Sequence, residues 1–211
     1  MPIHDWSRVS PAIFHDMHVG WIAEIARLLN TRLLPQSHFA LAERSKNSSD
    51  FAESSESQRL ASMQNQIAIR SANNDKLAAI IHIVSLGNKI SQTAVDDFVS
   101  GLTSAFEQGL NLLIIDLIPL EGFDPAEIHR CIWNTIGRKC SPRNDKPFTL
   151  ASYSIGAQAN CYVESTAVGE QLADMPLSLE LGRYISVPLE QTYMSAYEGV
   201  PQRWKRVLEA N

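Results

Sequence analysis

The sequence predicts an α/β (α+β) fold, in which helices flank a mixed sheet to give three layers. Helix-like and strand-like segments alternate over residues 10–137, and short strand-like segments separated by glycine and proline follow over residues 148–211. This order is typical of a mixed sheet covered by helices. With 211 residues, 45% of them hydrophobic, the chain can bury one core. We expect a single domain over 1–211, with its core at about 10–137 and a β-rich C-terminal part at about 148–211.

The first predicted helix begins at Ser10 and Pro11 and ends before Pro35. Serine favours the N-cap and proline the first helical position, and apolar residues recur between them and Pro35 at helical spacing. The next segment, 38–44, suits a short strand or a helix almost equally well. The serine-rich stretch 45–62 has few apolar residues to bury, so we expect a mobile surface loop there.

The middle of the chain predicts a hairpin followed by a β-α-β unit. Segments 66–70 and 77–85 flank the turn-forming residues SANND, a pattern typical of a β-hairpin. Ser91 then caps a helix that has one apolar stripe and is closed by Gly109, and the apolar run 112–118 follows. A strand, a helix and a strand in this order predict that 80–85 and 112–118 are adjacent and parallel, with a right-handed crossover.

The remaining elements are short. Residues 124–137 predict a helix, on which we place His129 on a solvated face. The strands that follow are expected at 148–154, 159–165, 177–181 and 184–187, the first two joined as a hairpin, and the helical pieces at 189–197 and 202–208.

Composition limits the partners. The chain carries 18 Lys plus Arg against 23 Asp plus Glu, a formal charge of -5. Nucleic acid remains a possible partner, but this net charge does not support it. The start of the chain lacks the features of a signal peptide, and its longest apolar stretch, 110–120, is interrupted by Asp116 and Pro119. We therefore expect a cytoplasmic protein with no membrane contact. The sequence indicates no other partner.

The first candidate site lies at the end of the predicted strand 77–85. That strand carries His82, and the loop after it presents Asn88 and Lys89. Open α/β sheets bind ligands at the carboxyl ends of their strands. Asp116 lies in the next strand, so His82 and Asp116 could meet across the sheet. The alternative is that His82 and Asp116 form a buried, hydrogen-bonded polar pair and that the loop after the strand is only a turn leading into the next helix.

A second candidate is the pair His15 and His18 in the first helix. Their spacing of three residues places both rings on one side, where they could share a metal ion. Alternatively, they only cap or pack. The chain contains no nucleophile elbow, P-loop or dinucleotide-binding fingerprint.

A series of motifs carries a family resemblance. MPIHDWSRV, FHDMH, FALAE, IVSLGNK, LLIIDLIP, DKPFTLASY and DMPLSLELGRYISVPLE occur in this order along nearly the whole chain, except 45–62. The chain resembles the bacterial domain-of-unknown-function family 4058, and its central block is similar to the acidic strand of the PD-(D/E)XK nuclease superfamily. The resemblance implies a PD-(D/E)XK-like core. It also implies that Glu43 and Asp116 hold a divalent metal and that Lys89 positions the attacking water, which makes these three the catalytic candidates.

The chain departs from the family at one important position. His82 falls where the family usually has a glutamate. Mg²⁺ requires hard oxygen ligands in near-octahedral geometry, so replacing a carboxylate by an imidazole removes both charge and hardness. We therefore expect a catalytically impaired protein that acts as a binding or regulatory module, with His82 and Asn88 as binding residues. The alternative is a Mg²⁺-dependent nuclease or phosphodiesterase, and Mg²⁺ is expected as a cofactor only in that case.

Overall fold

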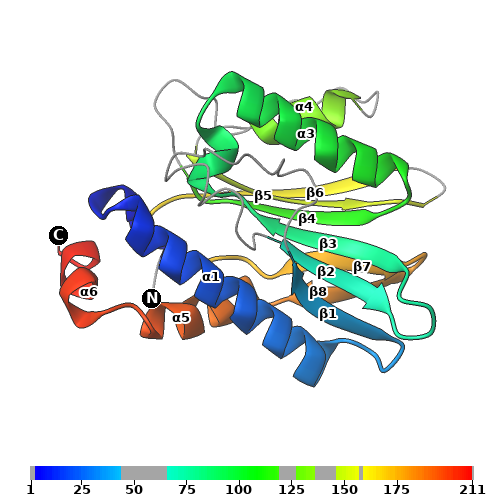
Figure 1. Ribbon diagram of the computed structural model, residues 1–211, viewed down its shortest axis with the longest axis horizontal. Helices are drawn as coiled ribbons and strands as arrows, with labels where there is room; N and C mark the ends of the chain where they lie inside the picture. Colours follow the sequence, from blue (N-terminus) through cyan, green and yellow to red (C-terminus); the bar gives the residue numbers. More distant parts are fainter. Residues whose placement is uncertain (1–2, 44–65, 119–126, 136–145, 157–158, 211) are drawn as a thin grey trace, which may run out of the picture.

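The computed structural model describes residues 3–43, 66–118, 127–135, 146–156 and 159–210. The predicted loop at 45–62 and the two ends of the predicted helix at 124–137 lie outside the described residues. In Figure 1 the described part forms layers on both sides of a central sheet.

The central sheet has six strands in the order β1-β2-β3-β4-β5-β6. Their bounds are β1 His38–Glu43, β2 Gln66–Ser71, β3 Leu77–Ile83, β4 Asn111–Asp116, β5 Phe148–Ser154 and β6 Asn160–Thr166. Strands β3 and β4 are parallel, and every other neighbouring pair is antiparallel. The predicted mixed sheet is confirmed, as are the β2–β3 and β5–β6 hairpins and the parallel pairing that the helical crossover indicates.

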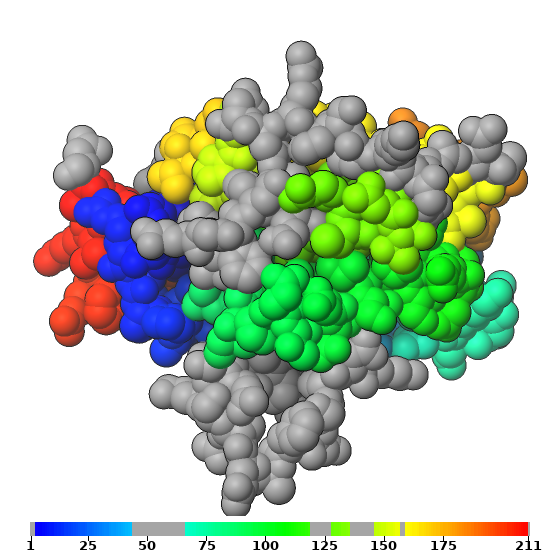
Figure 2. Space-filling view, turned by 90° about the horizontal axis from the view of Figure 1, so that it is seen from above, coloured from blue at the N-terminus to red at the C-terminus, as the bar shows by residue number. Residues whose placement is uncertain are grey.

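Five α-helices and a second, two-stranded sheet surround the central sheet in the described residues. They are α1 Pro11–Leu28, α3 Gln92–Glu107, α4 Glu127–Thr135, α5 Leu189–Glu198 and α6 Gln202–Leu208, with β7 Met175–Glu180 paired antiparallel to β8 Arg183–Val187. Helices α3 and α4 lie on one side of the sheet, and α1 and the β7–β8 hairpin on the other. Figure 2 views the molecule from the side that α3 and α4 cover. These two helices lie next to each other there, and α1 and α6 lie at one end.

Each side of the sheet has its own apolar core, because successive strand residues point to opposite faces. Ile81 and Ile83 of β3 belong to a cluster with α1, α5 and β7. Ile80 of β3 and Ile114 of β4 belong to a second cluster with α3 and α4. His82 lies between Ile81 and Ile83 along β3 and therefore faces α3.

Local sequence signals explain the helix ends. The Ser91 hydroxyl accepts a hydrogen bond from the amide of Ala94 at 3.2 Å, as expected of an N-cap. Gly109, just beyond the end of α3, has a φ of 93°, a conformation that glycine adopts without a steric cost. Both positions agree with the predictions.

The two ends of the described chain are joined at α5. The hydroxyl of Tyr193 accepts a hydrogen bond from the amide of His4 and another from Nε1 of Trp6, both at 3.1 Å. The His4 ring also stacks on Tyr197, with 3.8 Å between ring centroids. These four residues, which we call the N-terminal clasp, explain why the opening residues are buried.

The prediction for His129 is wrong. Its side chain is buried, and its Nδ1 lies 2.6 Å from the hydroxyl of Tyr153 on β5. Helix α4 packs against α3 and β5, so the face that carries His129 is turned inward. Burial lowers the pKa of His129 below its ordinary value.

Candidate functional site

The candidate site lies where the parallel strands β3 and β4 end side by side. His82 is opposite Ile114, and Ile83 is opposite Ile115. After β3 the chain forms a short 3-10 turn, η3, over Leu86–Lys89. The turn brings Lys89 back over the end of β4.

Asn88 fixes the shape of that turn. Its Oδ1 accepts hydrogen bonds from the backbone amide of Ser85 at 2.9 Å and from the Ser85 hydroxyl at 2.8 Å. The backbone amide of Asn88 in turn donates to the carbonyl of Ser85 at 3.1 Å. The amide oxygen of Asn88 is therefore committed to the turn.

Lys89 and Asp116 form a buried ion pair. Nζ of Lys89 lies 2.7 Å from Oδ2 of Asp116, and each side chain is only 5% exposed. The same ammonium donates to the carbonyl of Ile118 at 2.8 Å. Oδ1 of Asp116 accepts a 3.3 Å hydrogen bond from the backbone amide of Ile118.

The electrostatics of Asp116 follow from this arrangement. Burial raises the pKa of the Asp116 carboxyl above its ordinary value, while the Lys89 ammonium and the Ile118 amide act in the opposite direction. The ammonium compensates the carboxylate within a site that water hardly reaches. Loss of either partner would leave the other charged group buried without compensation, which is strongly destabilising.

Glu43 lies apart from this pair. It ends β1, and β2 and β3 separate β1 from β4. Three inter-strand spacings place the Glu43 and Asp116 backbones roughly 14 Å apart across the sheet, whereas the oxygen ligands of a Mg²⁺ ion each lie about 2.1 Å from it. The Glu43 carboxylate instead accepts two hydrogen bonds from Arg70, from Nε at 3.0 Å and from Nη2 at 3.1 Å.

His82 is a core residue. It is 1% exposed, and its ring centroid lies 4.6 Å from that of Phe98 on α3. Burial, with a smaller contribution from the charge of His18, lowers the pKa of His82 to about 3, although the Asn88 side chain partly opposes both effects. Its Nε2 has no hydrogen-bond partner among the residues that the structure describes. Asp116 pairs with Lys89 rather than with His82, so the polar pair considered from the sequence does not form.

The second candidate, His15 and His18, lies on α1 with 6.2 Å between the ring centroids. Nε2 of His18 lies 3.1 Å from the carbonyl oxygen of Ile83. Because a carbonyl only accepts, that nitrogen carries the hydrogen. The buried Nδ1 keeps a lone pair that no described residue meets. Nε2 of His15 is also buried and has no partner within the described ranges of the chain. Burial lowers the pKa of His18 to about 4.

The described part of the chain contains no cluster of metal-binding side chains. Over 3–43, 66–118, 127–135, 146–156 and 159–210, no group of three or more His, Cys, Asp or Glu side chains could hold a metal ion. Likewise, no helix within these ranges is both long enough and apolar enough to cross a membrane.

Sequence reasoning missed two parts of this region. The backbone of Ile118 completes the surroundings of Lys89 and Asp116, and no side-chain pattern could have indicated it. Arg70 was also missed, although a signal exists. Once 66–70 is paired with 38–44 as a neighbouring strand, Arg70 and Glu43 fall on the same face of the sheet.

Comparison with known proteins adds no relative, because no family model, no curated protein and no solved structure matches this chain.

Proposed function

We propose that the protein is a binding or regulatory module whose core is related to the PD-(D/E)XK nucleases but has lost their catalysis. One observation carries this proposal. The Lys89 ammonium lies 2.7 Å from Asp116 and 2.8 Å from the Ile118 carbonyl, and so occupies the position that a cation bound to Asp116 would take.

Electrostatics support a site without a metal. A Mg²⁺ ion would have to displace an ammonium that is almost fully buried, and it would then find a single carboxylate. Mg²⁺ gives up its water reluctantly and binds well only where several oxygens are arranged octahedrally. The neutral imidazole of His82 adds no charge. Glu43 lies on the edge strand β1 and is bound to Arg70, away from Asp116.

The experiment compares the unmodified protein with His82→Glu. Mg²⁺ binding is measured by calorimetry, and cleavage is measured on single- and double-stranded DNA and on RNA. For the unmodified protein we expect no heat of Mg²⁺ binding in the calorimeter and no cleavage of any of these substrates. His82→Glu places a carboxylate on the strand next to Asp116 and on the same face, so a gain of Mg²⁺ binding in that variant supports an ancestral metal site.

Glu43→Gln is the matched control, since it removes one carboxylate from the same sheet without approaching Asp116. It should leave the calorimetric result of both proteins unchanged. Robust Mg²⁺-dependent cleavage by the unmodified protein, abolished by Asp116→Asn, would overturn the proposal.

That outcome would support the alternative, a Mg²⁺-dependent nuclease or phosphodiesterase. The observation that favours the alternative is positional: Lys89 and Asp116 lie at the carboxyl ends of two parallel neighbouring strands, where α/β sheets commonly bind ligands. In such an enzyme Lys89 would release Asp116 to the metal and stabilise charge that develops on the phosphate.

A further inference from the structure

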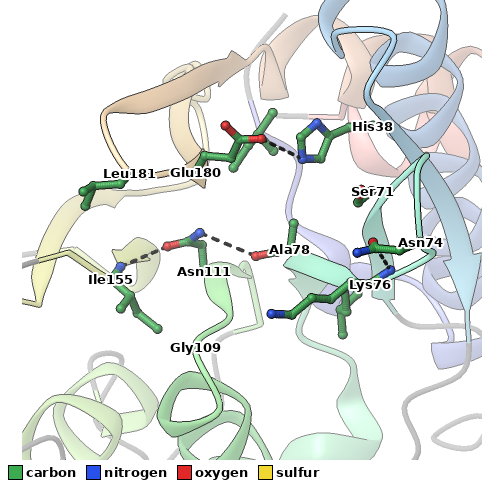
Figure 3. Close-up of a pocket in the computed structure, with 12 residues that line it drawn as sticks. His38, Ser71, Asn74, Lys76, Ala78, Gly109, Asn111, Ile155, Glu180 and Leu181 are labelled. Carbon is green, nitrogen blue, oxygen red and sulfur yellow. Dashed lines mark hydrogen bonds and ion pairs between the residues drawn. The ribbon is translucent and has the colours of Figure 1, made fainter.

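A third candidate binding site lies at the opposite end of β3 and β4. A pocket of about 340 Å³ opens where these strands begin, at Leu77, Ala78 and Asn111. Its rim is formed by the turn between β2 and β3 and by the turn between β7 and β8 (Figure 3). We call it the amino-end pocket. Its volume is within the range of about 300–1,000 Å³ found for small-molecule sites.

The β2–β3 turn supplies the hydrogen-bond donors. Lys76 is exposed and makes no ion pair with any described residue, and in Figure 3 its side chain extends across the pocket toward Asn111. Oδ1 of Asn74 accepts a hydrogen bond from the Lys76 amide at 3.1 Å, and the side-chain NH₂ group of Asn74 donates to no described residue. Ser71 also lines the pocket, and its hydroxyl accepts a 3.4 Å hydrogen bond from Asn73, so its own hydrogen remains to be donated.

The opposite rim carries a carboxylate. Glu180, at the end of β7, has a side chain that is 53% exposed, and its Oε1 lies 3.8 Å from Nε2 of His38. That distance is too long for a hydrogen bond, and the contact, which Figure 3 draws, is an ion pair only when His38 carries a second proton. The His38 side chain is only 5% exposed, and its Nδ1 lies 3.0 Å from the Ser37 hydroxyl. His38 is therefore fixed, while Glu180 keeps acceptor capacity toward the pocket.

The polar side chain in the floor between the two rims, Asn111, already has hydrogen-bond partners. Asn111 donates through Nδ2 to the carbonyl of Ala78 at 3.5 Å and accepts through Oδ1 from the amide of Ile155 at 2.9 Å. Both bonds are drawn in Figure 3. Leu77 and Leu179 line the pocket as well and present apolar surface. A ligand here would meet a floor made of the paired Asn111 side chain and apolar leucines, with donors on one side and an acceptor on the other.

We propose that the amino-end pocket binds a small zwitterion, an amino acid in the broad sense, with its carboxylate at Lys76 and its ammonium at Glu180. A plain anion would be repelled by Glu180 and by the C-terminal end of α3, which stops two residues before Gly109 of the pocket and carries a partial negative charge. A plain cation would be repelled by Lys76. Only a molecule that carries both charges gains a charge-assisted hydrogen bond at each rim. The site is separate from Lys89 and Asp116 and does not depend on what they do.

The test is an NMR titration of the ¹⁵N-labelled full chain. The zwitterionic probes are amino acids of increasing length, from glycine through 4-aminobutyrate to 6-aminohexanoate, and the singly charged probes are butyrate and butylamine. We expect saturable shifts of the Lys76, Asn111 and Glu180 amides with at least one zwitterion, at a concentration about tenfold below that needed for either singly charged probe.

Two surface variants assign the charges. Lys76→Met should weaken the best zwitterion about tenfold, to the level of butylamine, and Glu180→Gln should weaken it to the level of butyrate. Lys205→Met, on the distant helix α6, is the control that should leave the titration unchanged. Equal responses to zwitterion and butylamine, or shifts that neither Lys76→Met nor Glu180→Gln alters, would overturn the proposal. So would an absence of saturable shifts for every probe.

Discussion

Lowering the pH from about 7.5 to about 4.5 should strongly destabilise the protein through His18 and His82. Both side chains are 1% exposed, and burial lowers their pKa values to about 4 and about 3 in the folded state, against 6.5 in the unfolded chain. The unfolded chain therefore takes up protons first as the pH falls. The stabilisation due to the neutral rings is complete above pH 6.5 and is lost progressively below it.

The size of the effect follows from these pKa values. At about pH 4.5 each histidine lowers the free energy of unfolding by about 2.6 kcal/mol relative to neutral pH, so the two together cost about 5 kcal/mol. That loss is comparable with the entire stability of many domains, about 5–15 kcal/mol. The raised pKa of Asp116 acts in the opposite sense, because there the folded state binds the proton first. A comparison of variants cancels that contribution.

Urea unfolding, followed by tryptophan fluorescence at several pH values, measures the effect. His18 and His82 together should lower the free energy of unfolding by up to about 2.7 kcal/mol per pH unit below pH 6, which corresponds to two protons, in addition to the smaller contributions of His4, His15 and His129. His82→Leu, which keeps an apolar contact with Phe98, should lose about half of that slope. His18→Gln, which keeps a donor for the Ile83 carbonyl, should do the same. Slopes identical to that of the unmodified protein in both variants would refute the reasoning.

Three further substitutions test other contacts. Lys89→Met leaves Asp116 buried and unpaired and should lower the free energy of unfolding in urea by about 3–5 kcal/mol. The double variant Lys89→Met, Asp116→Leu should recover most of that loss. An unchanged stability of the single variant would contradict a buried ion pair. Glu43→Gln weakens a partly exposed pair with Arg70 and should cost less than about 1 kcal/mol by thermal unfolding, so a larger loss would show that this pair does more than stabilise a surface. Tyr193→Phe leaves two buried donors without an acceptor and should cost about 1–3 kcal/mol for each of them in urea unfolding; a neutral result would mean that water replaces the hydroxyl.

Most of the secondary structure could be predicted because its signals are local. Ser91 and Gly109 mark the two ends of α3 whatever surrounds the helix. The parallel pairing of β3 and β4 also followed from sequence order, since a strand, a helix and a strand have one strongly preferred arrangement. The segment 38–44 was ambiguous from its composition, and only pairing with β2 decides that it is a strand.

The candidate site could be predicted only in part. That His82 and Asp116 share a face follows from strand alternation, but the partner of Asp116 depends on the 3-10 turn that brings Lys89 back over β4. That turn is set by hydrogen bonds of Asn88 that composition does not show. The separation of Glu43 from Asp116 depends on the order of the strands. That order cannot be predicted from the sequence as long as it is undecided whether segment 38–44 is a strand and which strand it pairs with. His129 was misplaced for a related reason, since the inward face of a short helix is decided by what packs on it.

The N-terminal clasp has a consequence for the order of folding. His4 and its partner Tyr193 are separated by 189 positions in the sequence. Contacts over such separations form late, because the chain loses the entropy of closing a very large loop before it gains their energy. During synthesis Trp6 leaves the ribosome long before α5, and its indole N–H has to wait for Tyr193 before it finds its acceptor. The apolar surface of α1 that packs against α5 is exposed for the same interval, and exposed apolar surface makes a nascent chain prone to aggregation.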